Sequence, residues 1–96
     1  MVYDLLRQPA KMRHHLQRHI EAHGGNGQHY LFLGRALLLE KQREEAITAL
    51  LKSLEKNPQQ PEVHRLLAAT YRELGRLSEA DFHFARALEL QQQTVP

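Results

Sequence analysis

The chain carries one helical pattern twice, at a spacing of 34 residues. When the sequence is shifted by that spacing, Leu33 falls on Leu67 and Ala46 falls on Ala80. Small residues align with small residues and large apolar residues with large ones: Gly34 with Ala68, Leu37 with Tyr71, Leu50 with Phe84, and Ser53 with Ala87. A duplication of this length is typical of helix–turn–helix arrays, in which each hairpin buries its apolar face against its neighbours. Such arrays present surfaces to other proteins and rarely perform chemistry.

Apolar periodicity and helix-end signals predict an all-α fold, an antiparallel helical hairpin array with about five helices. We place these helices at about 9–22, 28–40, 44–56, 61–74 and 79–91. Gly75 is expected to end the fourth helix, and Ser78 is expected to cap the fifth. The fifth helix is expected to bury its apolar stripe, which consists of Ala80, Phe84, Ala87 and Leu88.

The domain organisation follows from the repeat. We expect a single domain over residues 1–96, with an N-terminal helix or half repeat at 9–23, a first repeat at 27–60 and a second at 61–94. The absence of cysteine excludes disulfides, thiolate metal sites and a thiol nucleophile. No signal peptide or long apolar run is found in the sequence. We therefore expect no membrane insertion, and a cytoplasmic location is favoured although the compartment is unknown.

These hairpins resemble tetratricopeptide repeats. The first repeat supplies the residues of that motif at Tyr30, Leu33, Gly34, Leu37, Ala46, Leu50, Ser53 and Pro58. The second supplies them at His64, Leu67, Ala68, Tyr71, Ala80, Phe84 and Ala87. The small residues allow two helix backbones to approach closely, and the large ones fill the remaining space. The chain departs from the family pattern at Lys41, where a turn glycine is usual, at His64, and at Gln92, where the exit proline is usual.

The resemblance implies a protein-interaction scaffold in which the first helix of each hairpin lines a concave peptide-binding groove. The matching groove positions are Gln28, Leu31, Arg35, Leu38, Glu62, Arg65, Ala69 and Arg72. Arginine forks suit carboxylates, so we expect a ligand segment with an apolar anchor and an acidic group or a free C-terminus. In the alternative interpretation, the two leucines belong to the core and the arginines only solvate a helix face.

The last helix points to a second function. Asp81 stands where the first repeat has Ile47, and Phe82 falls on a position expected to be exposed. An exposed phenylalanine on the last, uncovered helix suggests contact with a partner or a second copy. The alternative function is therefore an assembly or helper domain that acts mainly through self-association.

Histidines are abundant in the first helix. His15, His19 and His23 are spaced i, i+4, i+8, which places them on one side of a helix. Imidazoles at this spacing can share a transition metal. Histidines on a solvated basic face are the commoner explanation, so we predict no metal and no cofactor.

The same N-terminal segment carries the basic residues Arg7, Lys11, Arg13 and Arg18, which makes nucleic-acid contact a third, distant alternative. No stacking aromatics are interleaved with these charges, so nucleic acid is an unfavoured partner. The sequence also contains no glycine-rich phosphate loop and no nucleophile elbow. We therefore predict that the chain is not an enzyme.

Overall fold

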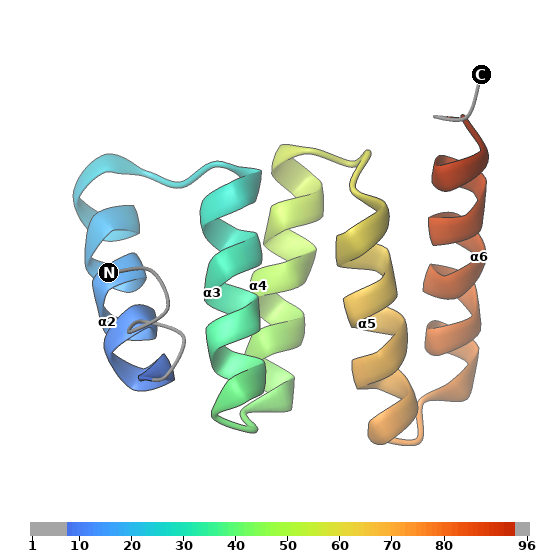
Figure 1. The fold of residues 1–96 in the computed structure, drawn as a ribbon, viewed down its shortest axis with the longest axis horizontal. Helices are drawn as coiled ribbons and strands as arrows, with labels where there is room; N and C mark the ends of the chain where they lie inside the picture. Colours follow the sequence, from blue (N-terminus) through green and yellow to red (C-terminus); the bar gives the residue numbers. More distant parts are fainter. Residues whose placement is uncertain (1–7, 94–96) are drawn as a thin grey trace.

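The computed structural model of the chain describes residues 8–93. This part consists of five helices and contains no strand: α2 (Pro9–His23), α3 (Gly27–Leu39), α4 (Arg43–Lys56), α5 (Pro61–Glu73) and α6 (Leu77–Gln93). Successive helices run antiparallel, and α2 and α6 lie at opposite ends of the array (Figure 1). The predicted all-α array of helical hairpins is confirmed. No helix within residues 8–93 has the length and apolar character needed to span a bilayer.

Small residues allow the helices of each hairpin to approach closely, as predicted. Gly34 is buried, and a Cβ atom on it would lie only 2.6 Å from Cδ2 of Leu50. Ala46, on the facing helix, is fully buried. The equivalents of Gly34 and Ala46 in the second hairpin are Ala68 and Ala80, and both are at most 5% exposed. The α3–α4 and α5–α6 pairs consequently form the two most extensive helix contacts in the array.

Two apolar clusters form the core. One cluster packs α2 against the first hairpin, through Leu33, Leu37, Ala46 and Ala49 with Leu16 and Ile20 beside them. The other packs the first hairpin against the second, through Leu31, Ile47, Leu50, Val63, Leu67, Tyr71 and Ala80. Within residues 8–93, every interior helix is therefore covered on two sides, whereas α2 and α6 are covered on one.

Polar contacts fix the ends of the first hairpin. The Asn26 side chain accepts a hydrogen bond from the His29 backbone N–H, and Nδ1 of His29 accepts one from the Asn26 backbone N–H, so the two residues form a capping box at the start of α3. The buried Ser53 hydroxyl donates to the Gly27 carbonyl over 2.7 Å. The Arg13 guanidinium pairs with Glu40 and ties α2 to the end of α3.

The two hairpin turns have the same shape despite different residues. Gly75 adopts a left-handed φ of 77°, and Lys41, the equivalent residue of the first hairpin, is held at a φ of 62°. The last helix begins directly after this turn, at Leu77. The prediction that Ser78 caps this helix is wrong, because the Ala80 N–H already bonds to the Arg76 carbonyl and Ser78 lies inside the first turn.

The predicted burial of α6 is wrong at two of four positions. Ala80 and Ala87 are buried against α5. Phe84 is 49% exposed and Leu88 is 46% exposed, whereas Leu50, the equivalent of Phe84 in the first repeat, is fully buried. The difference arises because α5 covers Leu50, and no element within residues 8–93 covers α6 in the same way.

The left-handed Lys41 provides a test of turn strain. A residue with a side chain is destabilised in this conformation by about 1–2 kcal/mol relative to glycine. We expect Lys41→Gly to raise the free energy of unfolding by up to about 1 kcal/mol, after the higher entropy of glycine in the unfolded chain is subtracted. Urea denaturation measures the change. Gly75→Lys should lower the stability, and a loss of stability in Lys41→Gly would contradict the argument.

The close approach at Gly34 provides a test of packing. In Gly34→Ala, the added methyl group would lie 2.6 Å from Cδ2 of Leu50, a side chain that is fully buried in the core. We expect overpacking to destabilise the folded chain by about 1–3 kcal/mol, which exceeds the stabilisation of about 1 kcal/mol from the higher helix propensity of alanine. The variant should therefore unfold at a lower urea concentration. Trimming the neighbour in Gly34→Ala/Leu50→Val should recover part of the loss. A more stable Gly34→Ala protein would show that the helices are not in close contact there.

Candidate interaction surface

An arginine surface, consisting of Arg65, Ala69 and Arg72, lies along the exposed side of α5. Together with Ala68 and with Phe84 of α6, these residues line a shallow pocket of about 250 Å³. Within residues 8–93, neither Arg65 nor Arg72 takes part in an ion pair. The pocket therefore combines an aromatic wall with two arginine side chains that are open to a ligand.

The predicted groove positions on α3 separate into two groups. Gln28 and Arg35 are exposed, and Arg35 lies 3.8 Å from the carboxylate of Glu62 on α5. Leu31 is only 6% exposed and belongs to the core between the two hairpins, and Leu38 is half-buried against the same core. Leu31 is therefore not a groove residue, because α5 packs over it.

The two repeats differ most at the positions that face the next helix pair. In the first repeat these positions are apolar and pack against α5: Leu31, Leu38, Ile47, Leu50 and Leu54. Their equivalents in the second repeat form a surface that we call the terminal face: Arg65, Arg72, Asp81, Phe84 and Leu88. Charged residues thus occupy three of the five positions in the second repeat, whereas Phe84 and Leu88 are apolar and exposed.

Phe82 is exposed, as the sequence predicts, with 59% of its surface accessible. Its ring meets His83 edge-to-face at 5.0 Å between centroids. Phe82 lies two residues from Phe84, and a helix turns by about 200° over that distance. It therefore does not share the terminal face, and its role in self-association stays a prediction.

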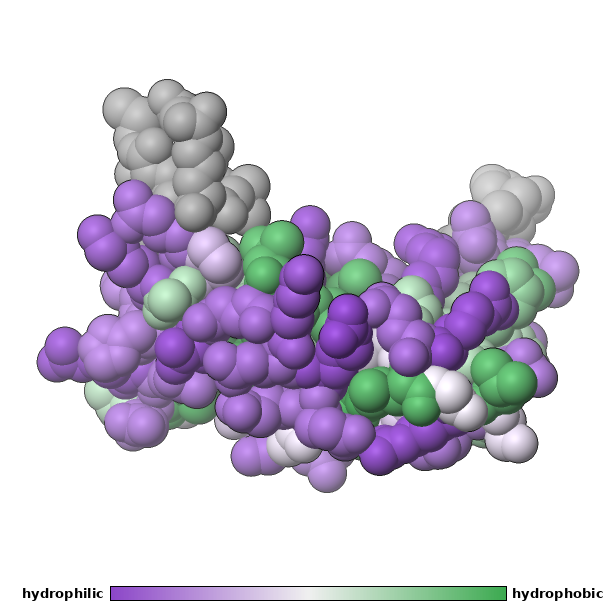
Figure 2. Space-filling model, turned by 90° about the horizontal axis from the view of Figure 1, so that it is seen from below, coloured by the Kyte–Doolittle hydropathy of each residue, from purple (hydrophilic) through white to green (hydrophobic). Residues whose placement is uncertain are grey.

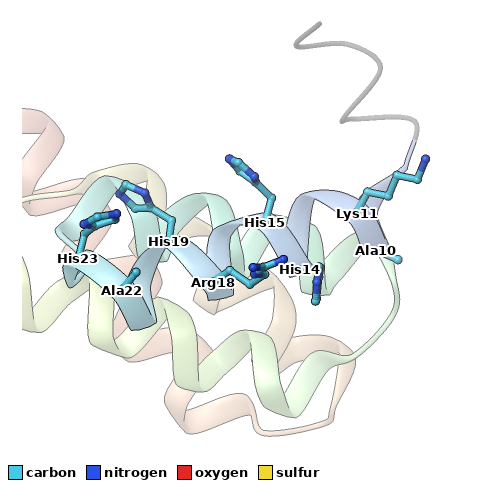
Figure 3. A pocket seen from close by; sticks show the side chains of 8 residues that line it. All are labelled: Ala10, Lys11, His14, His15, Arg18, His19, Ala22 and His23. Atoms are coloured by element: carbon cyan, nitrogen blue, oxygen red, sulfur yellow. The ribbon is translucent and has the colours of Figure 1, made fainter.

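The histidines of α2 do not converge on one point. Figure 3 shows His15, His19 and His23 spread along the helix, beside a broad pocket of about 580 Å³ on its outer side. The ring of His19 lies 5.1 Å from that of His23 and 4.7 Å from that of His29 on α3. Within residues 8–93, no group of three or more His, Cys, Asp or Glu residues is arranged to hold a metal ion. The structure thus offers no support for a metal site here.

A buried histidine pair, which sequence analysis did not predict, joins the helices of the second hairpin. Nδ1 of His64 lies 2.9 Å from Nδ1 of His83, and the ring of Tyr71 stacks on His83. One imidazole must donate and the other must accept, so the pair requires at least one neutral ring. The equivalent residues of the first repeat are Tyr30 and Ala49, and only this comparison between repeats could have signalled the pair.

The surroundings of the pair favour the neutral form of both rings. Desolvation lowers the pKa of His64, the positive charge of Arg86 lowers it further, and a backbone hydrogen bond at Pro58 acts in the opposite direction. Desolvation also lowers the pKa of His83, and the neighbouring His64 adds to that effect. Protonation of either imidazole therefore destabilises the folded hairpin.

The histidine pair should make stability depend on pH. Because both pKa values lie below the ordinary 6.5 in the folded chain, the unfolded chain binds more protons as the pH falls through that value. We expect the free energy of unfolding to be highest above about pH 6.5 and to fall toward about pH 5. Urea denaturation at several pH values measures the slope.

The first repeat supplies the matched variant. His64→Tyr/His83→Ala introduces the residues of Tyr30 and Ala49, and we expect it to flatten the dependence of stability on pH. The exposed His14→Gln serves as the control and should keep the slope of the wild type. An equal slope in the double variant would show that the pair does not contribute.

Comparisons with known proteins agree with this geometry. A family model described as tetratricopeptide repeat matches residues 11–70 and 37–96. The chain is also similar to solved structures of MamA. For MamA MSR-1 the sequence identity is 29%, with 97% of this chain and 53% of that chain covered and a TM-score of 0.88. One structure of MamA AMB-1 is 32% identical, with 92% of this chain and 52% of that chain covered and a TM-score of 0.84. A second structure of MamA AMB-1 is 30% identical, with 96% of this chain and 54% of that chain covered and a TM-score of 0.86.

The chain thus spans about half the length of the MamA chains that it matches. No curated protein matches it. The two overlapping family matches together extend over residues 11–96, the part of the chain that contains both helical hairpins. The chain belongs to the tetratricopeptide repeat family, and its fold is that of a protein-interaction scaffold.

Proposed function

We propose that the chain is a protein-binding module whose arginine surface holds a segment with an apolar anchor and an acidic group. The observation that carries the proposal is the pair of exposed arginines beside the pocket walled by Phe84, neither of which forms an ion pair within residues 8–93. Arg65 and Arg72 are seven residues apart and therefore lie on one side of α5. Two guanidinium groups on one side of a shallow apolar pocket suit a carboxylate that follows a hydrophobic side chain.

The charge balance favours a binding site on α5 over one on α3. Arg35 is offset by Glu62 at 3.8 Å, and both side chains are about half-exposed. A surface pair of this kind adds little stability, but it removes the net positive charge from that part of the groove. The positive charge that remains available to an acidic ligand is that of the arginine surface.

A peptide-binding measurement tests the proposal. The probe is a short fluorescent peptide that ends in leucine and carries two acidic residues, and its anisotropy reports binding. We expect Arg65→Ala/Arg72→Ala to weaken binding by about tenfold or more, since each arginine loses a charge-assisted hydrogen bond. Arg18→Ala, at the opposite end of the array, should bind as the wild type does.

The peptide itself supplies a second control. Replacing its acidic residues with the matching amides should reduce its affinity for the wild type and should make little difference to Arg65→Ala/Arg72→Ala. If the double variant bound the acidic peptide as tightly as the wild type, the arginine surface would not be the binding site.

A further inference from the structure

The exposed side of α6 carries a narrow stripe of four residues, which we call the α6 stripe: Leu77, Asp81, Phe84 and Leu88. Its spacing of four, three and four residues is that of the contact positions of a coiled coil. The three apolar members are 46–60% exposed and are among the most accessible large apolar side chains of residues 8–93. On the face seen in Figure 2, the larger hydrophobic patches lie toward the middle and the α6 side, whereas the α2 side is mostly hydrophilic. The stripe therefore has the spacing and the exposure of a helix that pairs with another helix.

The charges of the terminal face argue against a further repeat like the first. In the first repeat, all five contact positions are apolar and α5 packs directly on them. A hairpin docked in the same way on the terminal face would bury Arg65, Arg72 and Asp81. Burying charges without partners is costly, so an occupant must supply opposite charges for those that it buries.

From these observations we infer that the terminal face pairs with that of a second copy of this chain, with the two α6 helices antiparallel. This inference rests on the proposed function, because the α6 stripe is itself a segment with an apolar anchor and an acidic group. Phe84 and Leu88 are the anchor, and Asp81 is the acid that the arginine surface receives.

The geometry of the hairpin fixes which charges meet. His83 of α6 touches both His64 and Tyr71, so it is level with the middle of α5. Ala87, one turn further along α6, is therefore level with the first turns of α5, where Arg65 lies. In an antiparallel pair centred on Phe84, Asp81 of the second copy comes to the level of Ala87, and so it faces Arg65.

The two-fold symmetry repeats this contact, so that Asp81 of each copy faces Arg65 of the other. An antiparallel pair thus neutralises two acids and two arginines in one interface. A parallel pair would instead place Asp81 against Asp81, and like charges at a contact position are unfavourable. The single acid in the stripe therefore selects the antiparallel orientation.

Sedimentation velocity of the full chain over a range of concentrations tests the inference. We expect the wild type to form a dimer as the concentration rises, and added salt to weaken it because salt screens the attraction between Asp81 and Arg65. Asp81→Arg and Arg65→Asp should each weaken the dimer by about tenfold or more. The double variant Arg65→Asp/Asp81→Arg, which exchanges the two charges, should restore it.

Circular dichroism of each variant checks folding, and Glu55→Arg makes the same charge change on an exposed part of α4 as a matched control. A wild type that stays monomeric at every concentration, single variants that dimerise normally, or a double variant that stays monomeric would each overturn the inference. If the wild type is monomeric and still binds the acidic peptide through its arginines, the proposed function stands without the dimer. If it neither dimerises nor binds the peptide, both proposals fail.

Discussion

The close approach of the two helix backbones within each hairpin is the constraint on which the rest of the structure depends. At Gly34, the space that a Cβ atom would occupy lies 2.6 Å from the Leu50 side chain and 3.6 Å from the Ala46 carbonyl oxygen. The close contact brings the large residues of α3 and α4 into one layer that α5 can cover. In the second hairpin Ala68 tolerates its methyl group, because Phe84, which takes the place of Leu50, is free to lie outward. The same backbone geometry thus supports a sealed interface in one repeat and an open one in the other.

The fold could be predicted from the sequence because its signal is duplicated. Two copies of one pattern fix the period, the pairing of the helices and the small residues between them, and each copy supports the other. Even the left-handed turn at Lys41 follows from Gly75, since the equivalent positions have the same backbone shape. The helix ends were less predictable. Ser78 has the chemistry of a cap, but the turn at Gly75 sets the start of α6 one residue before it.

The candidate site was predicted only in part, because the repeat pattern describes how hairpins pack and does not say where the packing stops. The motif places Leu31 in a groove, but α5 covers it. The apolar stripe of the last helix predicts that Phe84 and Leu88 are buried, but within residues 8–93 no helix covers them. The histidine pair was missed for a different reason. His64 looks like a departure from the motif when it is considered alone, and its meaning depends on His83, which is nineteen residues away on the facing helix.

In the proposed dimer, the charged residues of the terminal face determine what kind of partner the array can accept. A terminal face with the five apolar residues of the first repeat would attract any amphipathic hairpin, and contacts of that head-to-tail kind extend into open filaments when the rotation between copies does not close. Charged residues at three of the five positions raise the free-energy cost of binding any partner that lacks opposite charges there. Phe84 and Leu88 provide the apolar area that binding requires. Specificity of this kind is a difference between affinities, and it is obtained as much by excluding wrong partners as by attracting the right one. In the proposed dimer, the positions that build the core in the first repeat are therefore the positions that select the partner in the second.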